Sequence, residues 1–227
     1  MKLVRNTLFA AAACVALVAA PVHADPVTIG SGNTGASFSL VFNGFSGSSA
    51  NVVTGLNARI DFTFTGLTGN DWNFSYNIFN QSSAPVTGSR VSTFAFNVNP
   101  DVTGATGGGI FPNVEFGANQ PNGIGTIELC FSSANCPGGG GDGVAQGGSG
   151  SGTFTLEFAS LLSSITLSDF FIRWQSIDGV PNVTSASGGV TECRGVNCDD
   201  QQVPEPATLL LLGSGLLGLA LRRRRAA

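Results

Sequence analysis

Residues 60–65 read Ile60-Asp61-Phe62-Thr63-Phe64-Thr65, and residues 72–78 read Trp72-Asn73-Phe74-Ser75-Tyr76-Asn77-Ile78. In both segments large apolar side chains alternate with small polar ones, a period of two residues that is typical of a half-buried β-strand. A Gly/Asn-rich cluster at residues 66–70 separates the segments and favours a turn. The two segments therefore predict antiparallel strands with one face in a core and the other in water.

The same alternation recurs along most of the chain. It is found at residues 38–42, 94–98, 127–131 and 154–158, while residues 165–174 are more continuously apolar, as in a central strand. Clusters rich in Gly, Asn, Pro and Ser separate these segments, and no amphipathic helix is evident outside the two ends of the chain. Seven or eight such strands predict an all-β fold, an antiparallel β-sandwich or jelly-roll-like domain of two sheets.

The C-terminal end carries three signals in a fixed order. Val203, Pro204, Glu205 and Pro206 come first, and the two prolines favour an extended segment that a helix does not enter. An apolar span follows at residues 207–221, which predicts a transmembrane helix if the bilayer thins slightly around it. The chain then carries four basic residues, which predict a cytoplasmic end: Arg222, Arg223, Arg224 and Arg225.

This order of motif, span and basic end resembles the PEP-CTERM sorting signal of Gram-negative bacteria. The resemblance implies recognition by an exosortase, a membrane cysteine protease-transpeptidase that would cut near Pro204-Glu205-Pro206 and release or transfer the ectodomain. A plain C-terminal membrane anchor is the alternative interpretation.

The N-terminal end has the pattern of a secretory signal peptide. Lys2 and Arg5 form the charged region, residues 8–20 are apolar, and Val22-His23-Ala24 is a small-residue cleavage site. We expect cleavage by signal peptidase between Ala24 and Asp25, after export through the Sec machinery. The predicted organisation is a signal peptide at 1–24, a β-sandwich ectodomain at 25–184, a stalk or linker at 185–202, and the sorting signal with its transmembrane helix at 203–227. Within the ectodomain, the Gly/Ser-rich residues 137–152 predict a flexible loop.

The charge of the exported domain excludes one class of partner. Residues 25–202 hold thirteen acidic and four basic side chains, a net charge of −9, whereas the whole chain has a net charge of −4. Nucleic-acid binding depends on basic side chains that neutralise phosphates, so we expect no nucleic-acid partner.

The cysteines predict disulfides. Cys14 leaves with the signal peptide, so the exported domain keeps Cys130, Cys136, Cys193 and Cys198, an even number in an oxidising compartment. The simplest pairing is local, Cys130 with Cys136 and Cys193 with Cys198. A zinc site is the less favoured alternative because the spacings are loose and no histidine remains, so no metal site is expected.

Little in the exported domain supports catalysis or a cofactor. His23, the only histidine, leaves with the signal peptide, and residues 25–202 contain no lysine, so Ser–His, Ser–Lys and Cys–His nucleophilic pairs are impossible and no catalytic residue is assigned. Glu115, Glu128 and Glu157 are weak candidates for a carboxylate pair, and two of them fall on predicted solvent faces.

Three kinds of binding stay open from the sequence. Carboxylates and an amide in loops are hard ligands for calcium, although they match no known repeat: Asn99, Asp101, Asp142, Asp199 and Asp200. Trp72 and Trp174 can stack on sugars, but their positions in the alternation predict the core. Thr63/Thr65 and Thr153/Thr155 are similar to the Thr-x-Thr pairs of ice-binding faces, which is weak evidence because such pairs are common in strands.

Several stretches of the domain also resemble the "cistern" group of PEP-CTERM proteins, among them residues 88–96, 121–125, 129–131 and 168–176. We therefore expect a non-enzymatic, exported protein that passes through the inner membrane to the cell surface or extracellular matrix. The resemblance adds a link to exopolysaccharide and biofilm. A secreted carbohydrate- or calcium-binding module is the alternative.

Overall fold

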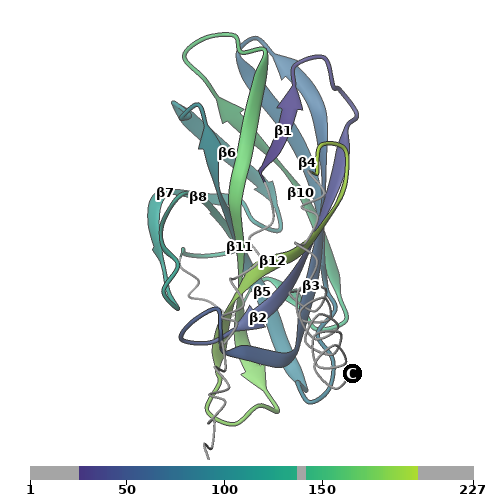
Figure 1. Cartoon of the computed structure of the whole chain (residues 1–227), viewed down its shortest axis with the longest axis vertical. Coiled ribbons are helices and arrows are strands. Elements are labelled where there is room, and N and C mark those ends of the chain that lie inside the picture. Colours follow the sequence, from purple (N-terminus) through teal and green to yellow (C-terminus); the bar gives the residue numbers. More distant parts are fainter. Residues whose placement is uncertain (1–25, 137–141, 199–227) are drawn as a thin grey trace, which may run out of the picture.

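The computed structural model describes residues 26–136 and 142–198, which form a wholly antiparallel β-structure (Figure 1). This confirms the all-β, antiparallel part of the expected fold class. The predicted signal peptide, sorting motif and C-terminal helix lie outside the described residues. Within the described part of the chain, no helix has the length and apolar character needed to cross a membrane. The strands are β1 (Val27–Gly30), β2 (Ser37–Phe45), β3 (Val52–Thr68), β4 (Asp71–Asn80), β5 (Gly88–Asn99), β6 (Gly104–Gly109), β7 (Asn113–Gln120), β8 (Gly125–Ser132), β9 (Val144–Ala145), β10 (Ser149–Glu157), β11 (Ser164–Asp178) and β12 (Ser185–Gly195).

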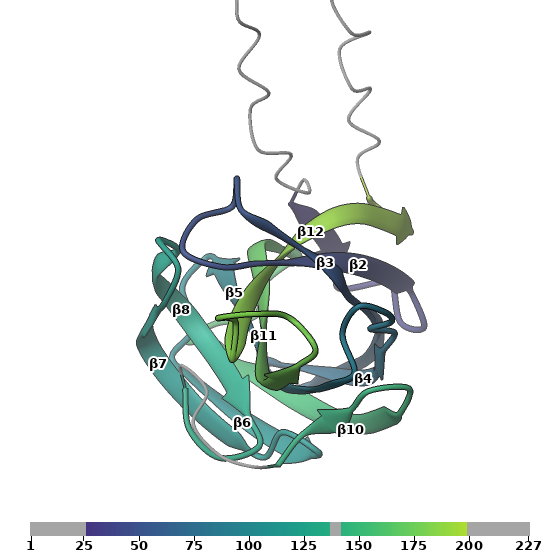
Figure 2. The same ribbon diagram turned by 90° about the horizontal axis from the view of Figure 1, so that it is seen from below.

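The described strands form one sheet, where the sequence predicted a sandwich of two. Its order is β6-β10-β4-β3-β2-β12-β11-β5-β8-β7, with β1 paired to β11 and β9 paired to β5. The two ends of this path, β6 and β7, follow one another in the chain and are joined by residues 110–112. Seen from below, the sheet curls into a nearly closed, barrel-like ring (Figure 2).

The curling has a local cause in the longest strands. β3 and β11 contain 17 and 15 residues, and the pairing of β11 with β5 shifts register at three places. Such irregularities bend a strand and increase its right-handed twist. A long, bent strand can therefore run from one side of the curled sheet to the opposite side.

Phenylalanine side chains fill the interior of the curled sheet. Phe154 of β10 lies at the centre of this cluster, with its ring centroid 4.8 Å from that of Phe74 and 5.1 Å from that of Phe131. Trp72 and Trp174 are fully buried, which confirms their predicted place in the core. The apolar side of each alternating segment thus faces inward, as the period of two requires.

Tyr76 links β4 to the closing segment of the ring. Its hydroxyl donates to the carbonyl of Gly108 and accepts from the N–H of Phe111, both at 3.0 Å. The phenol reaches Gly108 by passing over Gly152 of the intervening strand β10, where an added Cβ would lie 2.3 Å from the Tyr76 oxygen. Residue 152 must therefore be glycine for the Tyr76 hydroxyl to reach Gly108 across the curled sheet.

The predicted stalk is wrong for most of its length. Residues 185–195 form β12, which pairs with β11 on one side and β2 on the other, so it is an interior strand of the sheet. Its small residues have a packing reason, because a Cβ at Gly188 would lie 2.4 Å from the Trp174 ring. Residues 199–202 lie outside the described part of the chain.

The predicted flexible loop at residues 137–152 is also partly structured. Residues 144–145 form β9 against β5, and β10 begins at residue 149. β9 is held by Asn80, a buried side chain of β4 whose Nδ2 donates to the carbonyl of Val144 at 3.0 Å. Residues 137–141 lie outside the described part.

Candidate functional site

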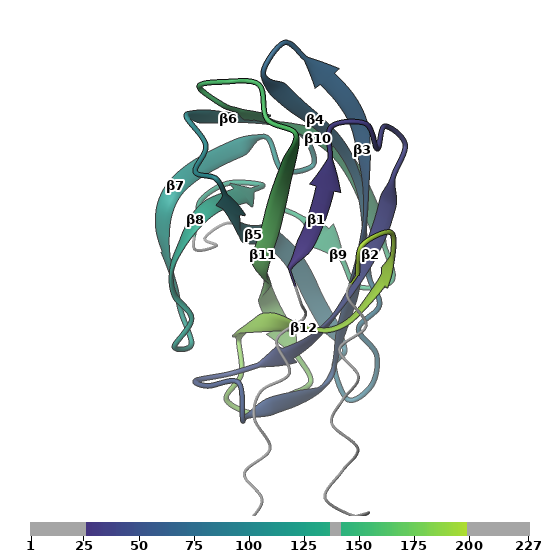
Figure 3. The same cartoon turned by 45° about the horizontal axis from the view of Figure 1, so that its top comes forward.

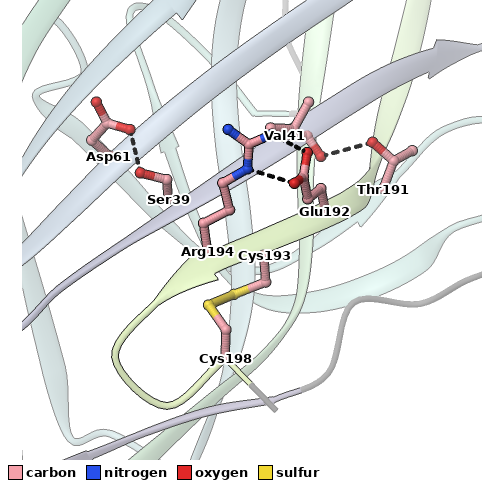
Figure 4. Close-up of polar contacts among 8 residues, drawn as sticks. All are labelled: Ser39, Val41, Asp61, Thr191, Glu192, Cys193, Arg194 and Cys198. Carbon is pink, nitrogen blue, oxygen red and sulfur yellow. Dashed lines mark hydrogen bonds and ion pairs between the residues drawn. A yellow bond between two sulfur atoms is a disulfide. The ribbon is translucent and has the colours of Figure 1, made fainter. Parts of the chain in front are cut away.

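The end of β12 is where the described domain leads toward the predicted sorting motif (Figure 4). Cys193, in β12, is joined to Cys198 by a disulfide that closes the turn after the strand. The expected local pairing is therefore present at this end of the domain. The disulfide holds the last described residue against the strand that precedes it.

A second set of contacts ties this turn to the first strand. Val27 forms an isolated antiparallel bridge with Cys198, and Asn197 donates from Nδ2 to the carbonyl of Thr28 at 2.6 Å. Asn197 adopts a positive φ of 57°, a conformation that asparagine tolerates better than most residues. Residues 26 and 198, the two ends of the described domain, therefore lie side by side.

β1 lies beside β11 in the sheet (Figure 3). Its first residue, Val27, is bridged to Cys198, the end of the described domain, which we call the exit. β1 pairs with residues 164–167 of β11, and β12 pairs with residues 171–175 on the same strand. β1 and β12 are thus successive partners of one long strand. This arrangement brings the beginning and the end of the domain together.

Charged side chains near the exit are paired with one another. Arg194 donates from Nη2 to Glu192 at 2.9 Å, and this hydrogen bond lowers the pKa of the exposed Glu192 carboxyl. Thr191 donates to the carbonyl of Val41 at 3.3 Å where the pairing of β12 with β2 shifts register. Nearby on the same sheet, Asp61 accepts from Ser39 at 2.6 Å and forms an ion pair with Arg59.

The predicted processing residues lie outside the described residues. They are Val203, Pro204, Glu205 and Pro206, together with Ala24 and Asp25 at the signal-peptide site and Arg222, Arg223, Arg224 and Arg225 at the basic end. Five residues, 199–203, separate Cys198 from Pro204. Six residue steps reach at most about 22 Å even when fully extended. The motif is therefore tethered close to the folded domain by covalent length alone.

The other two predicted cysteines also form a disulfide, Cys130–Cys136, on a different part of the sheet. They pack with Ala95, Ala118 and Ile127 in a small buried cluster separate from the main core. Cys130 is fully buried and Cys136 nearly so. This disulfide supports an outer layer on β5, β7 and β8, far in sequence from the exit.

The remaining candidates have structural partners or no assembled site. The Glu128 carboxylate accepts from the N–H groups of Val98 and Val102, at 2.8 and 3.2 Å, and so fixes the chain after β5. Within residues 26–136 and 142–198, no three His, Cys, Asp or Glu side chains are grouped to hold a metal ion. Asp199 and Asp200 lie beyond the described domain.

The Thr-x-Thr pairs lie on β3 and β10, the two strands that flank β4 in the sheet. Thr63 of β3 and Thr153 of β10 are both in register with Ser75 of β4, so they form one row across the strands. The second threonine of each pair forms a hydrogen bond to Asn73. Thr65 donates to the Asn73 carbonyl, and Thr155 donates to the Asn73 amide oxygen. These contacts explain the residues as strand-stabilising pairs.

Sequence reasoning did not single out Val27 or Asn197, which hold the exit. Asn197 lies between the two cysteines of a short turn, and asparagine is one of the residues that favour a turn with positive φ. The turn at Asn197 was therefore predictable from the sequence. The Val27–Cys198 bridge joins residues far apart in the chain, and no local pattern indicates it.

Comparison with known families gives one match, and it lies at the C-terminal end. Residues 202–225 match the PEP-CTERM protein-sorting motif. No curated protein and no solved structure matches the chain. The match supports the sorting signal, and it gives no support to the more specific resemblance to the cistern group.

Proposed function

We propose that the chain is an exported, non-enzymatic protein of the cell surface or extracellular matrix, which an exosortase processes near Pro204-Glu205-Pro206 and which associates with exopolysaccharide in a biofilm. The observation that carries the proposal is the sorting motif at residues 202–225. Proteins with this motif are exported and are processed by an exosortase. The signal peptide expected at residues 1–24 agrees with this route.

The shape of the exit supports processing without unfolding of the domain. The Cys193–Cys198 disulfide and the Val27–Cys198 bridge fix the chain immediately before the spacer at 199–203. A protease that cuts near Pro204 would therefore leave every described contact of the domain intact. The released product would be the nearly closed sheet with a short C-terminal extension.

The composition of the domain supports a structural or binding role. Residues 25–202 contain no histidine and no lysine, which removes the usual general bases of nucleophilic catalysis. Glu128 already accepts two backbone hydrogen bonds. We therefore propose a role in the matrix that depends on the folded surface and involves no chemical step.

Intact-mass spectrometry of the protein from cells with and without their exosortase tests the proposal. We expect loss of the tail around residues 207–227 only when the exosortase is present. A variant with Pro204, Glu205 and Pro206 replaced by alanine should keep the tail in both strains, while Gln201→Ala should be processed normally. An unchanged tail in wild-type cells would contradict the proposal and leave a plain membrane anchor.

Association with the matrix needs a separate measurement. Cells that export the protein are fractionated, and the processed form is followed in the exopolysaccharide and in the medium. We expect the processed form to sediment with the exopolysaccharide. Recovery of all of the processed protein as a free species in the medium would contradict the matrix role while leaving the sorting route intact.

A further inference from the structure

A pocket of about 240 Å³ opens between the β2–β3 loop and the β7–β8 loop. Three large apolar side chains line it: Phe45, Ile124 and Phe171. Ser48, Ser49 and Asn122 supply polar groups beside them. Phe170 belongs to the main core and Phe171 packs on the small cluster around Cys130, so the pocket lies on the outer side of β11.

A hydrogen-bonded clasp joins the two loops. The Asn122 amide oxygen accepts from the N–H of Gly47, and its Nδ2 donates to Ser187, both at 2.9 Å. Ser187 is buried in β12 and also donates to the carbonyl of Pro121 at 3.4 Å. Asn122 thus connects β12 with both loops, so the pocket exists before any ligand arrives.

The Cys130–Cys136 disulfide supports the apolar side of the pocket. Ile124 and Phe171 are the partly buried side chains packed against the cluster that contains both cysteines. A short disulfide on the outer face, far in sequence from the sorting motif, therefore helps to hold the two side chains that a ligand would contact. This gives the first cysteine pair a role that the sorting signal does not explain.

The chemistry of the lining selects the class of ligand. None of the seven residues that line the pocket carries a charge. Aromatic and aliphatic surfaces with a few hydroxyl and amide groups suit a small ring that has an apolar face and hydroxyl edges. The pocket is smaller than the roughly 300–1,000 Å³ typical of drug-sized ligands, so it takes about one ring. From this geometry, and resting on the proposed association with exopolysaccharide, we infer that the pocket is a subsite for one neutral sugar unit of a polysaccharide.

Saturation-transfer NMR on the full-length chain tests the inference, in a detergent without a sugar headgroup. The probes are the neutral tetrasaccharides cellotetraose, maltotetraose, mannotetraose and tetra-N-acetylchitotetraose, with tetragalacturonate as the charged counterpart. We expect saturation transfer to at least one neutral probe and binding of tetragalacturonate that is weaker by about tenfold or more. No transfer to any of the four neutral probes, or equal binding of tetragalacturonate, overturns the inference.

A matched pair of variants locates the binding. Ser49→Trp places a large ring at the pocket, and Ser160→Trp makes the same change at an exposed position of the β10–β11 loop. We expect Ser49→Trp to weaken binding by about tenfold or more and Ser160→Trp to leave it unchanged. Equal binding by the Ser49→Trp variant and the wild type places the sugar elsewhere and overturns the inference.

A milder variant guards against misfolding. If Ser49→Trp lowers the unfolding temperature, the double variant Ser48→Ala, Ser49→Ala removes both hydroxyls with little change in volume, and it too should bind more weakly. Unchanged binding in a folded double variant overturns the assigned polar contacts. None of these measurements uses an exosortase, so failure of sugar binding and failure of sorting are distinguishable.

Discussion

The hydroxyl of Tyr76 is a single group on which closure of the sheet depends. Burial raises the pKa of Tyr76 to about 12, against the smaller, opposing effect of the hydrogen bond from the Phe111 N–H. Because the pKa in the folded protein exceeds the value of about 10 in the unfolded chain, the folded state holds this proton more tightly. The protonated Tyr76 phenol contributes fully to the stability of the fold below about pH 10, and this contribution is lost as the pH rises toward about 12.

Tyr76 is the only tyrosine, so its ionisation can be measured directly. We expect the ultraviolet absorbance of tyrosinate to appear near pH 12 in the folded protein, and unfolding by urea to become easier between about pH 10 and pH 12. A protein unfolded in urea, which should titrate near pH 10, is the control. Titration of the folded protein near pH 10 would show that the phenol is exposed to water.

Asn122 offers a second test on one side chain. Asn122→Gly keeps the positive φ of 64° available but removes the hydrogen bonds to Gly47 and Ser187. We expect the free energy of unfolding, from urea titration, to fall by about 1–3 kcal/mol because polar groups lose their partners. Asn182→Gly is the matched control, since Asn182 also has a positive φ of 61° and is exposed; its effect should stay within about 0.5 kcal/mol. Equal effects of the two variants would refute the clasp.

The two disulfides close loops of almost equal length but lie in different surroundings. Their sequence separations are 6 and 5 residues, for which loop entropy gives about 2 kcal/mol each. Cys130 and Cys136 are buried in a packed cluster, whereas Cys193 and Cys198 are half-buried at the margin of the main core. We therefore expect packing, and not loop entropy, to make the two disulfides differ in their contribution to stability.

We expect the variant Cys130→Ala, Cys136→Ala to lose more stability than the variant Cys193→Ala, Cys198→Ala, by about 1–3 kcal/mol, because it also removes buried sulfur atoms. Urea titration of both variants against the wild type measures the difference. Equal losses would mean that loop entropy alone determines the contribution of each disulfide.

The described domain is a nearly closed sheet, and its first and last described residues lie together at one exit. β12 lies between β11 and β2, and Cys198 lies beside Val27. The folded domain therefore lies within about 22 Å of Pro204, and the proposed protease would have to reach the motif within this distance of the domain.

Spacer length should thus control processing. Deletion of residues 199–201 should lower the fraction of processed protein, because it draws the folded domain toward the place where the enzyme must bind. Replacement of these residues by Gly-Ser-Gly keeps the length and should be processed like the wild type. Intact-mass measurement of the cellular protein gives both fractions, and equal processing of the deletion variant would show that the domain does not hinder the enzyme.

The sequence by itself determined the features that depend on near neighbours in the chain. Alternation at residues 60–65 and 72–78 indicated strands and placed Phe62, Phe64 and Trp72 in the core, because a period of two assigns each side chain to one face. The short separations of the cysteines indicated their pairing. The motif at residues 202–225 is read directly from consecutive residues, and it is the basis of the proposed sorting route.

Only the tertiary structure decided which strands are neighbours. A period of two says which face a residue takes and nothing about the partner strand, so one curled sheet and two packed sheets have the same pattern. Residues 185–202 were predicted to be a stalk because they hold the second cysteine pair and end at the sorting motif. Residues 185–195 instead form β12, where Gly188 packs against Trp174. The Val27–Cys198 bridge and the Asn122 clasp join segments far apart in the chain, and such contacts follow from the closure of the whole sheet.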